Sequence, residues 1–207
     1  MSGFSAIGIG RHRIGVDGEG VTTLVGGYGC PLDCRYCLNP QCNRGKPSLT
    51  LSANELLERL KIDNLYFEAT NGGITFGGGE PLLQAAFIRD FILRCRDEGY
   101  RWRFWLETCL AVPGEALDAV DDLIDGFIVD VKDMNPAIYT AYTSRSPNRM
   151  LANLRTLAER CPEKVIVRLP LIEGFNTPED VERSADTVCA MGFTRLDRFT
   201  YQTKIGK

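Results

Sequence analysis

Residues 21–40 read VTTLVGGYGCPLDCRYCLNP, a stretch that indicates both the fold class and the chemistry of the chain. It begins with the apolar, β-branched run Val21–Val25, which is typical of a buried strand. After a glycine-rich turn come Cys30, Cys34 and Cys37, with the spacing C-x3-C-x2-C, whereas the other five of the eight cysteines are scattered. The stretch therefore predicts a loop that follows a strand and carries three closely spaced thiols.

Three neighbouring thiols indicate a metal centre. Thiolates are the usual protein ligands of iron–sulfur clusters, and three of them leave one iron of a four-iron cluster without a protein ligand. A structural zinc site takes four ligands, and Cys42 could be the fourth, but such sites usually combine two separated pairs and no second C-x2-C pair exists. The spacing favours the cluster, with a non-catalytic zinc module as the alternative. Packing is the better interpretation for Cys42, Cys95, Cys109, Cys161 and Cys189.

Length and composition restrict the class of protein. A chain of 207 residues can form one sizeable core, so we expect a single domain over residues 1–207. Its net charge of −3 gives no reason to expect a nucleic-acid partner. No run approaches the roughly 18 apolar residues of a membrane helix, and the first residues do not resemble a secretory signal. We therefore expect a cytoplasmic protein without a membrane partner, in which cysteines rarely form disulfides.

Segments typical of strands and helices alternate along the chain. The expected strands are Val21–Val25, Gly73–Phe76, Arg103–Glu107, Phe127–Val131, Val165–Leu169 and Leu196–Tyr201. Helices are expected from a capping box at Ser52 to Leu60, from Pro81 to Gly99, around Ala116–Leu123, over Pro147–Arg160, and from Thr177 to Gly192. Six successive β-then-α units predict an α/β fold with a parallel sheet covered by helices. Because a full eight-unit barrel takes about 250 residues, we expect an open, partial (β/α)6 TIM-like barrel, with a doubly wound sheet as the alternative.

Polar and glycine residues follow the first four of these strands. Carboxyl ends of parallel strands lie at one edge of a sheet, where ligands bind. The residues that we expect to share this site are Cys30, Gly77, Gly78, Gly79, Glu80, Glu107, Asp130 and Lys132. Glycines at a strand end let the backbone approach a ligand closely, although a plain turn would look the same.

Three charged side chains are further candidates for ligand binding. Asp130 and Lys132 lie two residues apart, so on a strand they share a face. An unpaired charge inside a barrel is costly, so the two need a ligand or form an internal ion pair. Arg168, near the end of the fifth strand, could bind a carboxylate in a bidentate manner or pair with a neighbouring loop. The residues themselves leave both alternatives open.

The cysteine spacing, with the aromatic Tyr36 before the third cysteine, resembles the signature of the radical S-adenosylmethionine (SAM) superfamily. Within it, the chain is most similar to activating enzymes of glycyl-radical enzymes, such as the pyruvate formate-lyase activating enzymes. Five segments carry this likeness in order: Asp17–Gly20, Gly72–Gln84, Glu107–Thr108, Asp130–Asn135 and Val167–Pro170. Departures are Leu38 and Leu110, where histidine and glycine are usual, and Gln202 after Tyr201, where the group has a histidine.

The resemblance implies a radical SAM fold and an enzyme. This enzyme would hold one [4Fe–4S] cluster and SAM, and it would cleave SAM reductively to a 5′-deoxyadenosyl radical. It would use this radical to install a glycyl radical on a partner enzyme. It implies that Gly77–Glu80 contact SAM, that Lys132 faces the SAM carboxylate and that Asp130 faces the ribose or a monovalent cation. Glu107 and Thr108 would be further ligands of that cation. A flavodoxin- or ferredoxin-type electron donor and a monomeric enzyme are also implied. The runner-up is a radical SAM enzyme that modifies a small molecule or peptide, similar to 7-carboxy-7-deazaguanine synthase.

Overall fold

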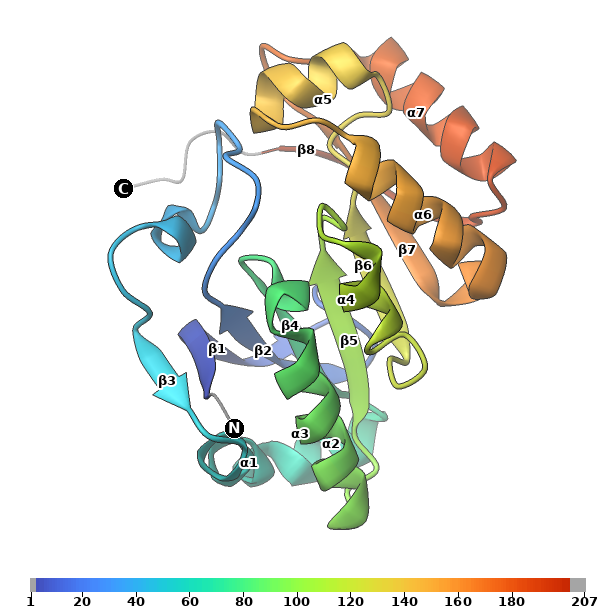
Figure 1. The fold of residues 1–207 in the computed structure, drawn as a ribbon. Coiled ribbons are helices and arrows are strands. Elements are labelled where there is room, and N and C mark those ends of the chain that lie inside the picture. The colour runs from blue at the N-terminus through green and yellow to red at the C-terminus, as the bar shows by residue number, and fades with distance from the viewer. Residues whose placement is uncertain (1–2, 202–207) are drawn as a thin grey trace. The chain divides into compact units, whose positions relative to one another are not determined.

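Strands and helices alternate from Phe4 to Thr200, and the computed structural model describes residues 3–201 (Figure 1). The strands are β1 (Phe4–Ile14), β2 (Val21–Gly27), β3 (Leu49–Leu51), β4 (Gly73–Gly78), β5 (Arg103–Thr108), β6 (Gly126–Asp130), β7 (Val165–Leu171) and β8 (Arg195–Thr200). The α-helices are α1 (Ala53–Leu60), α2 (Asn64–Thr70), α3 (Ala85–Asp97), α4 (Gly114–Asp118), α5 (Pro136–Thr143), α6 (Asn148–Arg160) and α7 (Pro178–Ala190). Short 3₁₀ helices lie at Pro40–Asn43, Lys61–Asp63, Pro81–Gln84 and Pro162–Lys164.

The chain packs as two compact units. The first unit comprises the chain up to Cys30, Asn39–Thr108 and Val112–Ile128, and the second comprises Pro31–Leu38, Cys109–Ala111 and the chain from Val129 on. Strand order in the first unit is β3-β1-β2-β4-β5, followed by the start of β6; in the second unit the end of β6 is followed by β7 and β8. Among the described strands, β3 and β8 have one neighbour each, so the predicted α/β fold with an open sheet is confirmed.

The six predicted strands are present as β2, β4, β5, β6, β7 and β8. The pairs β2–β4, β4–β5 and β7–β8 are parallel. Sequence reasoning missed β1 and β3, which add antiparallel pairs at the edge of the first unit. Their pattern is weak because β1 is mostly half-buried and contains two glycines, while β3 has only three residues.

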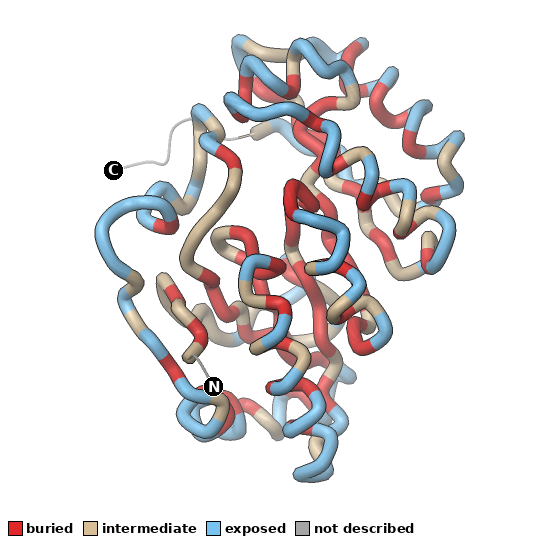
Figure 2. The backbone as a smooth tube through the Cα atoms, viewed as in Figure 1, coloured by how far each residue is buried: buried red, intermediate tan, exposed pale blue. Residues whose placement is uncertain are grey.

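The core of the first unit lies between α3 and the sheet. Figure 2 shows buried residues along β4 and β5. The ring of Phe76 on β4 lies 6.0 Å from Phe91 on α3 and 5.7 Å from Phe4 on β1, between ring centroids. Leu83 lies within the helix predicted from Pro81 to Gly99, but it is 50% exposed. The reason is that residues 81–84 form a separate 3₁₀ helix and α3 begins only at Ala85.

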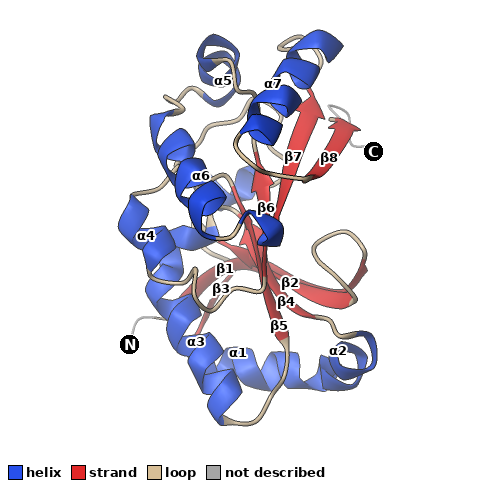
Figure 3. Cartoon of the chain, turned by 90° about the vertical axis from the view of Figure 1, so that its right-hand side faces the viewer, coloured by secondary structure: helices blue, strands red, loops and turns tan. Residues whose placement is uncertain are grey.

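Capping signals located helix starts accurately. The capping box predicted at Ser52 begins α1, and Thr177, where a helix start was predicted, begins α7 with a second capping box. In the second unit α7 packs against β7 (Figure 3). The expected helix around Ala116–Leu123 is shorter and earlier, at Gly114–Asp118, and α2 and α5 were not predicted. Within residues 3–201, no helix is long and apolar enough to cross a membrane.

Candidate functional site

The first predicted cluster cysteine is held by an asparagine that sequence reasoning missed. Asn43 Oδ1 accepts a hydrogen bond from the Cys30 amide at 2.7 Å, and Asn43 Nδ2 donates to the Cys30 carbonyl at 3.0 Å. The neighbouring Gly29 amide donates to the Cys42 carbonyl at 2.8 Å. Cys42 itself is only 2% exposed, as expected of a packing residue. The 3₁₀ helix Pro40–Asn43 therefore clamps the backbone on which Cys30 is carried.

The glycines at the carboxyl end of β4 have a packing role that the sequence did not reveal. The Gly79 amide donates to the Gly27 carbonyl at 3.0 Å. A Cβ atom at Gly79 would lie 2.3 Å from the Gly29 carbonyl oxygen and 2.7 Å from that of Gly27. Gly78 has a φ of +85°, in the left-handed region that favours glycine, and its carbonyl accepts from Asn39 Nδ2 at 3.1 Å. These glycines thus allow β4 to lie directly against the backbone that leads to Cys30.

Glu80 and Thr108 join the ends of β4 and β5. Glu80 Oε1 accepts from Thr108 Oγ1 at 2.8 Å and from the Leu82 amide at 3.1 Å, and both side chains are buried. The carboxylate of Glu107 lies over β4, because a Cβ at Gly77 would be 2.9 Å from Glu107 Oε2. The first unit therefore gathers the predicted acidic residues and glycines at the carboxyl ends of neighbouring strands.

The second unit carries the other two cysteines. Their loop is anchored to α5, because the Asp33 amide donates to the Thr143 carbonyl at 3.0 Å and the Arg35 amide to the Tyr142 carbonyl at 3.1 Å. The ring of Tyr36 lies edge-on to Phe175 at 5.8 Å. The Tyr36 carbonyl accepts from the Tyr201 hydroxyl at 2.7 Å, a contact that ties the loop to the segment after β8. Gln202, which replaces the histidine of similar proteins, lies outside the described residues.

Asp130 and Lys132 form an ion pair, Nζ to Oδ2, of 2.8 Å. The Lys132 side chain is 10% exposed, and its Nζ lies 6.0 Å from the centre of the Tyr201 ring. Burial acts to lower the pKa of Lys132, but the charges of Asp130 and of the nearby Cys34 outweigh it, and the pKa is raised. The ammonium is therefore charged at neutral pH, close to a predicted cluster ligand and with a carboxylate beside it.

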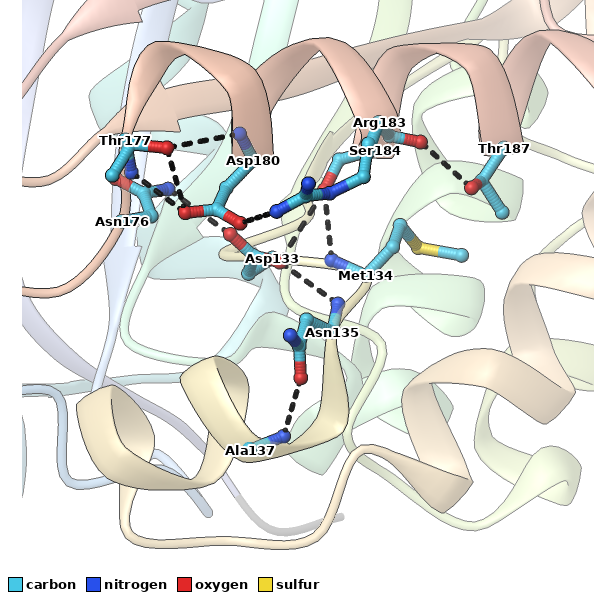
Figure 4. Close-up of polar contacts among 10 residues, drawn as sticks. All are labelled: Asp133, Met134, Asn135, Ala137, Asn176, Thr177, Asp180, Arg183, Ser184 and Thr187. Carbon is cyan, nitrogen blue, oxygen red and sulfur yellow. Dashed lines mark hydrogen bonds and ion pairs between the residues drawn. The ribbon is translucent and has the colours of Figure 1, made fainter.

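A buried acid fixes the loop that follows Lys132 (Figure 4). Asp133, 2% exposed, accepts from the Asn135 amide at 2.8 Å and from Asn176 Nδ2 at 3.1 Å. Ser184 on α7 donates to the same carboxylate at 3.4 Å and accepts from the Met134 amide at 3.0 Å. Burial raises the pKa of Asp133. This network holds the loop after β6 against α7. The sequence indicates it only through the position of Asp133.

The position of Arg168 differs from the prediction. It lies in the middle of β7 rather than at its end, because the strand continues to Leu171. Arg168 Nε is 3.4 Å from Asp197 Oδ2, opposite it on β8. Arg168 therefore forms an ion pair, as in the second alternative given above, but its partner lies on a strand and not in a loop.

The thiol chemistry fits an iron–sulfur cluster. None of the eight cysteines, all of which lie within residues 3–201, forms a disulfide, and Cys30, Cys34 and Cys37 are partly exposed. In residues 3–201, no group of three or more His, Cys, Asp and Glu side chains is arranged to hold a single metal ion. In a four-iron cluster each thiolate binds a different iron, so its cysteines need not converge on one point.

Comparisons with known proteins agree with this chemistry. The family model of the radical SAM superfamily matches residues 24–188. The "(2S)-3-sulfopropanediol dehydratase activating enzyme" of Klebsiella oxytoca is 35% identical over 75% of this chain and 50% of that protein. The "Pyruvate formate-lyase-activating enzyme" of Clostridium pasteurianum is 28% identical over 84% of this chain and 71% of that protein. The crystal structure of a domain of pyruvate-formate lyase-activating enzyme from Bacteroides vulgatus has a TM-score of 0.54 and 28% identity, over 63% of this chain and 81% of that one.

Proposed function

The chain belongs to the radical SAM superfamily, and from this premise we propose that Cys30, Cys34 and Cys37 hold a [4Fe–4S] cluster that binds SAM. The observation that carries the proposal is the match over residues 24–188, which includes the loop with these three cysteines. When bound, the cluster and SAM supply a 5′-deoxyadenosyl radical, by one-electron cleavage of SAM to methionine, for removing a hydrogen atom from a substrate. The protein's own residues bind the cofactors, orient the substrate and exclude water from the site.

We propose that the charged pair of the second unit binds SAM. Lys132 would face the SAM carboxylate, while Asp130 would face the ribose or a monovalent cation. The burial of Lys132 and its proximity to the charge of Cys34 support this role. In the first unit we propose that the backbone of Gly77–Gly79, together with Glu80, binds the SAM amino group. We propose that Glu107 and Thr108 bind the cation. Tyr36 and Arg168 complete the proposed set of cofactor-binding residues.

The proposed substrate is a glycyl-radical enzyme, on which a glycine Cα would lose the hydrogen atom. The activating-enzyme names of the two relatives support this substrate over a small molecule. We further propose that residues 1–207 form one catalytic domain, that it works as a cytoplasmic monomer, and that a flavodoxin- or ferredoxin-type protein supplies the electron. The eight cysteines, all within the described residues, form no disulfide, which is consistent with a reducing compartment.

The test is SAM cleavage by the reconstituted chain without oxygen. Wild type, Cys34→Ala and Cys189→Ala are each assayed for iron, sulfide and 5′-deoxyadenosine after reduction with dithionite. We expect about four iron and four sulfide per chain in wild type and in Cys189→Ala, which changes an exposed cysteine of α7. Cys34→Ala should form no product. Zinc in place of iron, or equal product from Cys34→Ala, would refute the proposal.

The substrate class has its own test. The reduced chain is mixed with SAM and a purified glycyl-radical enzyme, and the radical is followed by electron paramagnetic resonance. An activating enzyme should form about one 5′-deoxyadenosine per radical installed, because each hydrogen atom removed uses one SAM. Many turnovers on a small molecule, with no protein radical, would favour the runner-up instead.

A further inference from the structure

A pocket in the second unit is built on the cysteine loop itself. Its volume is about 380 Å³, and we call it the arginine pocket. The residues that matter for its chemistry are Pro31, Leu32, Arg145, Ser146, Asn148 and Arg149. The first two belong to the cysteine loop, and the other four come from the junction of α5 and α6. The pocket therefore joins the loop to a segment more than a hundred residues further along the chain.

The charge of this pocket is positive and not balanced locally. Arg145 donates from Nε to the carbonyl of Pro31 at 3.0 Å, a contact with backbone and not with an acid. In the part of the chain that the structure describes, neither Arg145 nor Arg149 has an ion pair, and no Asp or Glu lines the pocket. Other arginines of this unit do have carboxylate partners, for example Arg183 with Asp180. Two exposed guanidinium groups are thus concentrated at one place on a chain whose net charge is −3.

The location of the pocket links this charge to the cluster loop. Pro31 directly follows Cys30 in sequence, and Leu32, which is 4% exposed, lies two residues before Cys34. An anionic group bound by Arg145 would therefore lie one hydrogen bond from the loop backbone. A protein that passes electrons to the cluster has to approach this loop closely. Transient redox complexes have small interfaces, and complementary charges chiefly raise their association rates.

We propose that the arginine pocket is the docking site of an acidic, reduced flavoprotein of the flavodoxin type. This rests on the proposed radical SAM function. The transfer is a one-electron step: the donor is oxidised by one electron, the chain's cluster is reduced by one, and no bond forms or breaks. A carboxylate of the donor would bind between Arg145 and Arg149, where the pocket offers charge, a hydroxyl and an amide together.

The experiment compares two reductants on the reconstituted protein. One is a purified acidic flavodoxin, reduced beforehand, and the other is dithionite, which needs no docking surface. The variant is Arg149→Glu, because no interaction of Arg149 is lost within the described residues. The matched control is Arg155→Glu, which makes the same charge change at another exposed position of α6. Arg145→Gln serves as a second variant, which removes the contact with Pro31.

At low salt we expect Arg149→Glu to lower the second-order rate of reduction by flavodoxin about tenfold or more, while Arg155→Glu stays within about twofold of wild type. The difference should shrink as sodium chloride is added, because salt screens exposed charges. Dithionite-driven 5′-deoxyadenosine formation should be equal in wild type, Arg149→Glu and Arg155→Glu.

Equal flavodoxin rates in wild type and Arg149→Glu would overturn the proposal. The proposal would also be overturned if Arg149→Glu lowered only glycyl-radical formation when dithionite is the reductant. That result would assign the pocket to binding of the substrate protein. A third outcome would identify a small-anion site instead. In that case a few millimolar citrate at constant ionic strength would stabilise the chain against unfolding, while Arg149→Glu would leave the rate of reduction by flavodoxin unchanged. Failure of the proposed function is separate, since it would appear as no 5′-deoxyadenosine from wild type with dithionite.

Discussion

Replacing Gly79 by alanine should destabilise the fold by steric conflict with backbone. The added Cβ would lie 2.3 Å from the Gly29 carbonyl oxygen and 2.7 Å from that of Gly27. Neither oxygen belongs to a flexible side chain, so the strand end itself must move. That movement also threatens the hydrogen bond from the Gly79 amide to the Gly27 carbonyl, 3.0 Å long.

Overpacking of a tight site typically costs about 1–3 kcal/mol, and a lost backbone hydrogen bond adds about 0.5–1.5 kcal/mol. We therefore expect Gly79→Ala to lower the free energy of unfolding by about 2–4 kcal/mol, which reduces the ratio of folded to unfolded chain by about 30- to 700-fold. The matched control is Gly8→Ala. A Cβ at Gly8 would meet nothing within 4 Å, so this variant should stay within about 0.5 kcal/mol of wild type.

The assay is urea unfolding of the reduced, cluster-free chain, followed by tryptophan fluorescence. Trp102 and Trp105, which are 4% and 0% exposed, report on the core of the first unit. The comparison requires equal slopes of the free energy against urea concentration, so that midpoints reflect stability. If Gly79→Ala and Gly8→Ala unfolded at the same urea concentration, the steric reasoning would be refuted.

Three further predictions concern single side chains. Asn43→Ala should lose iron to a chelator several-fold faster than wild type, because the clamp on the first cluster cysteine is removed; equal rates of iron loss would contradict the clamp. Hydrogen bonds from the backbone and side chain of Thr177 lower the pKa of Asp180 below its ordinary 3.8, so this cap stabilises α7 above about that pH and loses its effect as the pH falls through the lowered value. The urea midpoint of Asp180→Asn should accordingly lie below that of wild type at pH 7, and the gap should close toward pH 3. Burial raises the pKa of Cys95 to about 12, so iodoacetamide should label exposed Cys189 and spare Cys95 in the folded chain, as mass spectrometry can show.

Local sequence patterns were sufficient for the fold class. Local patterns located the six predicted strands, and the capping signals at Ser52 and Thr177 marked two helix starts. Each of these signals is contained within a few neighbouring residues, because strand periodicity and helix capping are local properties. Where the pattern was weak, as in half-buried β1, the prediction failed.

The spacing of the cysteines and the motifs around them likewise indicated the family. Three thiols within eight residues restrict the metal chemistry by composition and spacing alone. The same sequence could not choose between a ligand-binding role and an ion pair for Lys132. The structure shows the 2.8 Å ion pair with Asp130, and the proposed SAM contact rests on the burial of Lys132 and the proximity of Cys34.

The sequence by itself thus determined the alternation of strands and helices, the cysteine loop and the superfamily. Tertiary structure alone decided which side chains support that loop and the loop after β6. Asn43 binds the backbone of Cys30, Arg145 binds Pro31, and Asn176 binds Asp133, across 13, 114 and 43 positions of sequence respectively. The physical reason is that a hydrogen bond depends on distance and direction in space, and chain segments this far apart approach one another only after the strands have paired and the helices have packed.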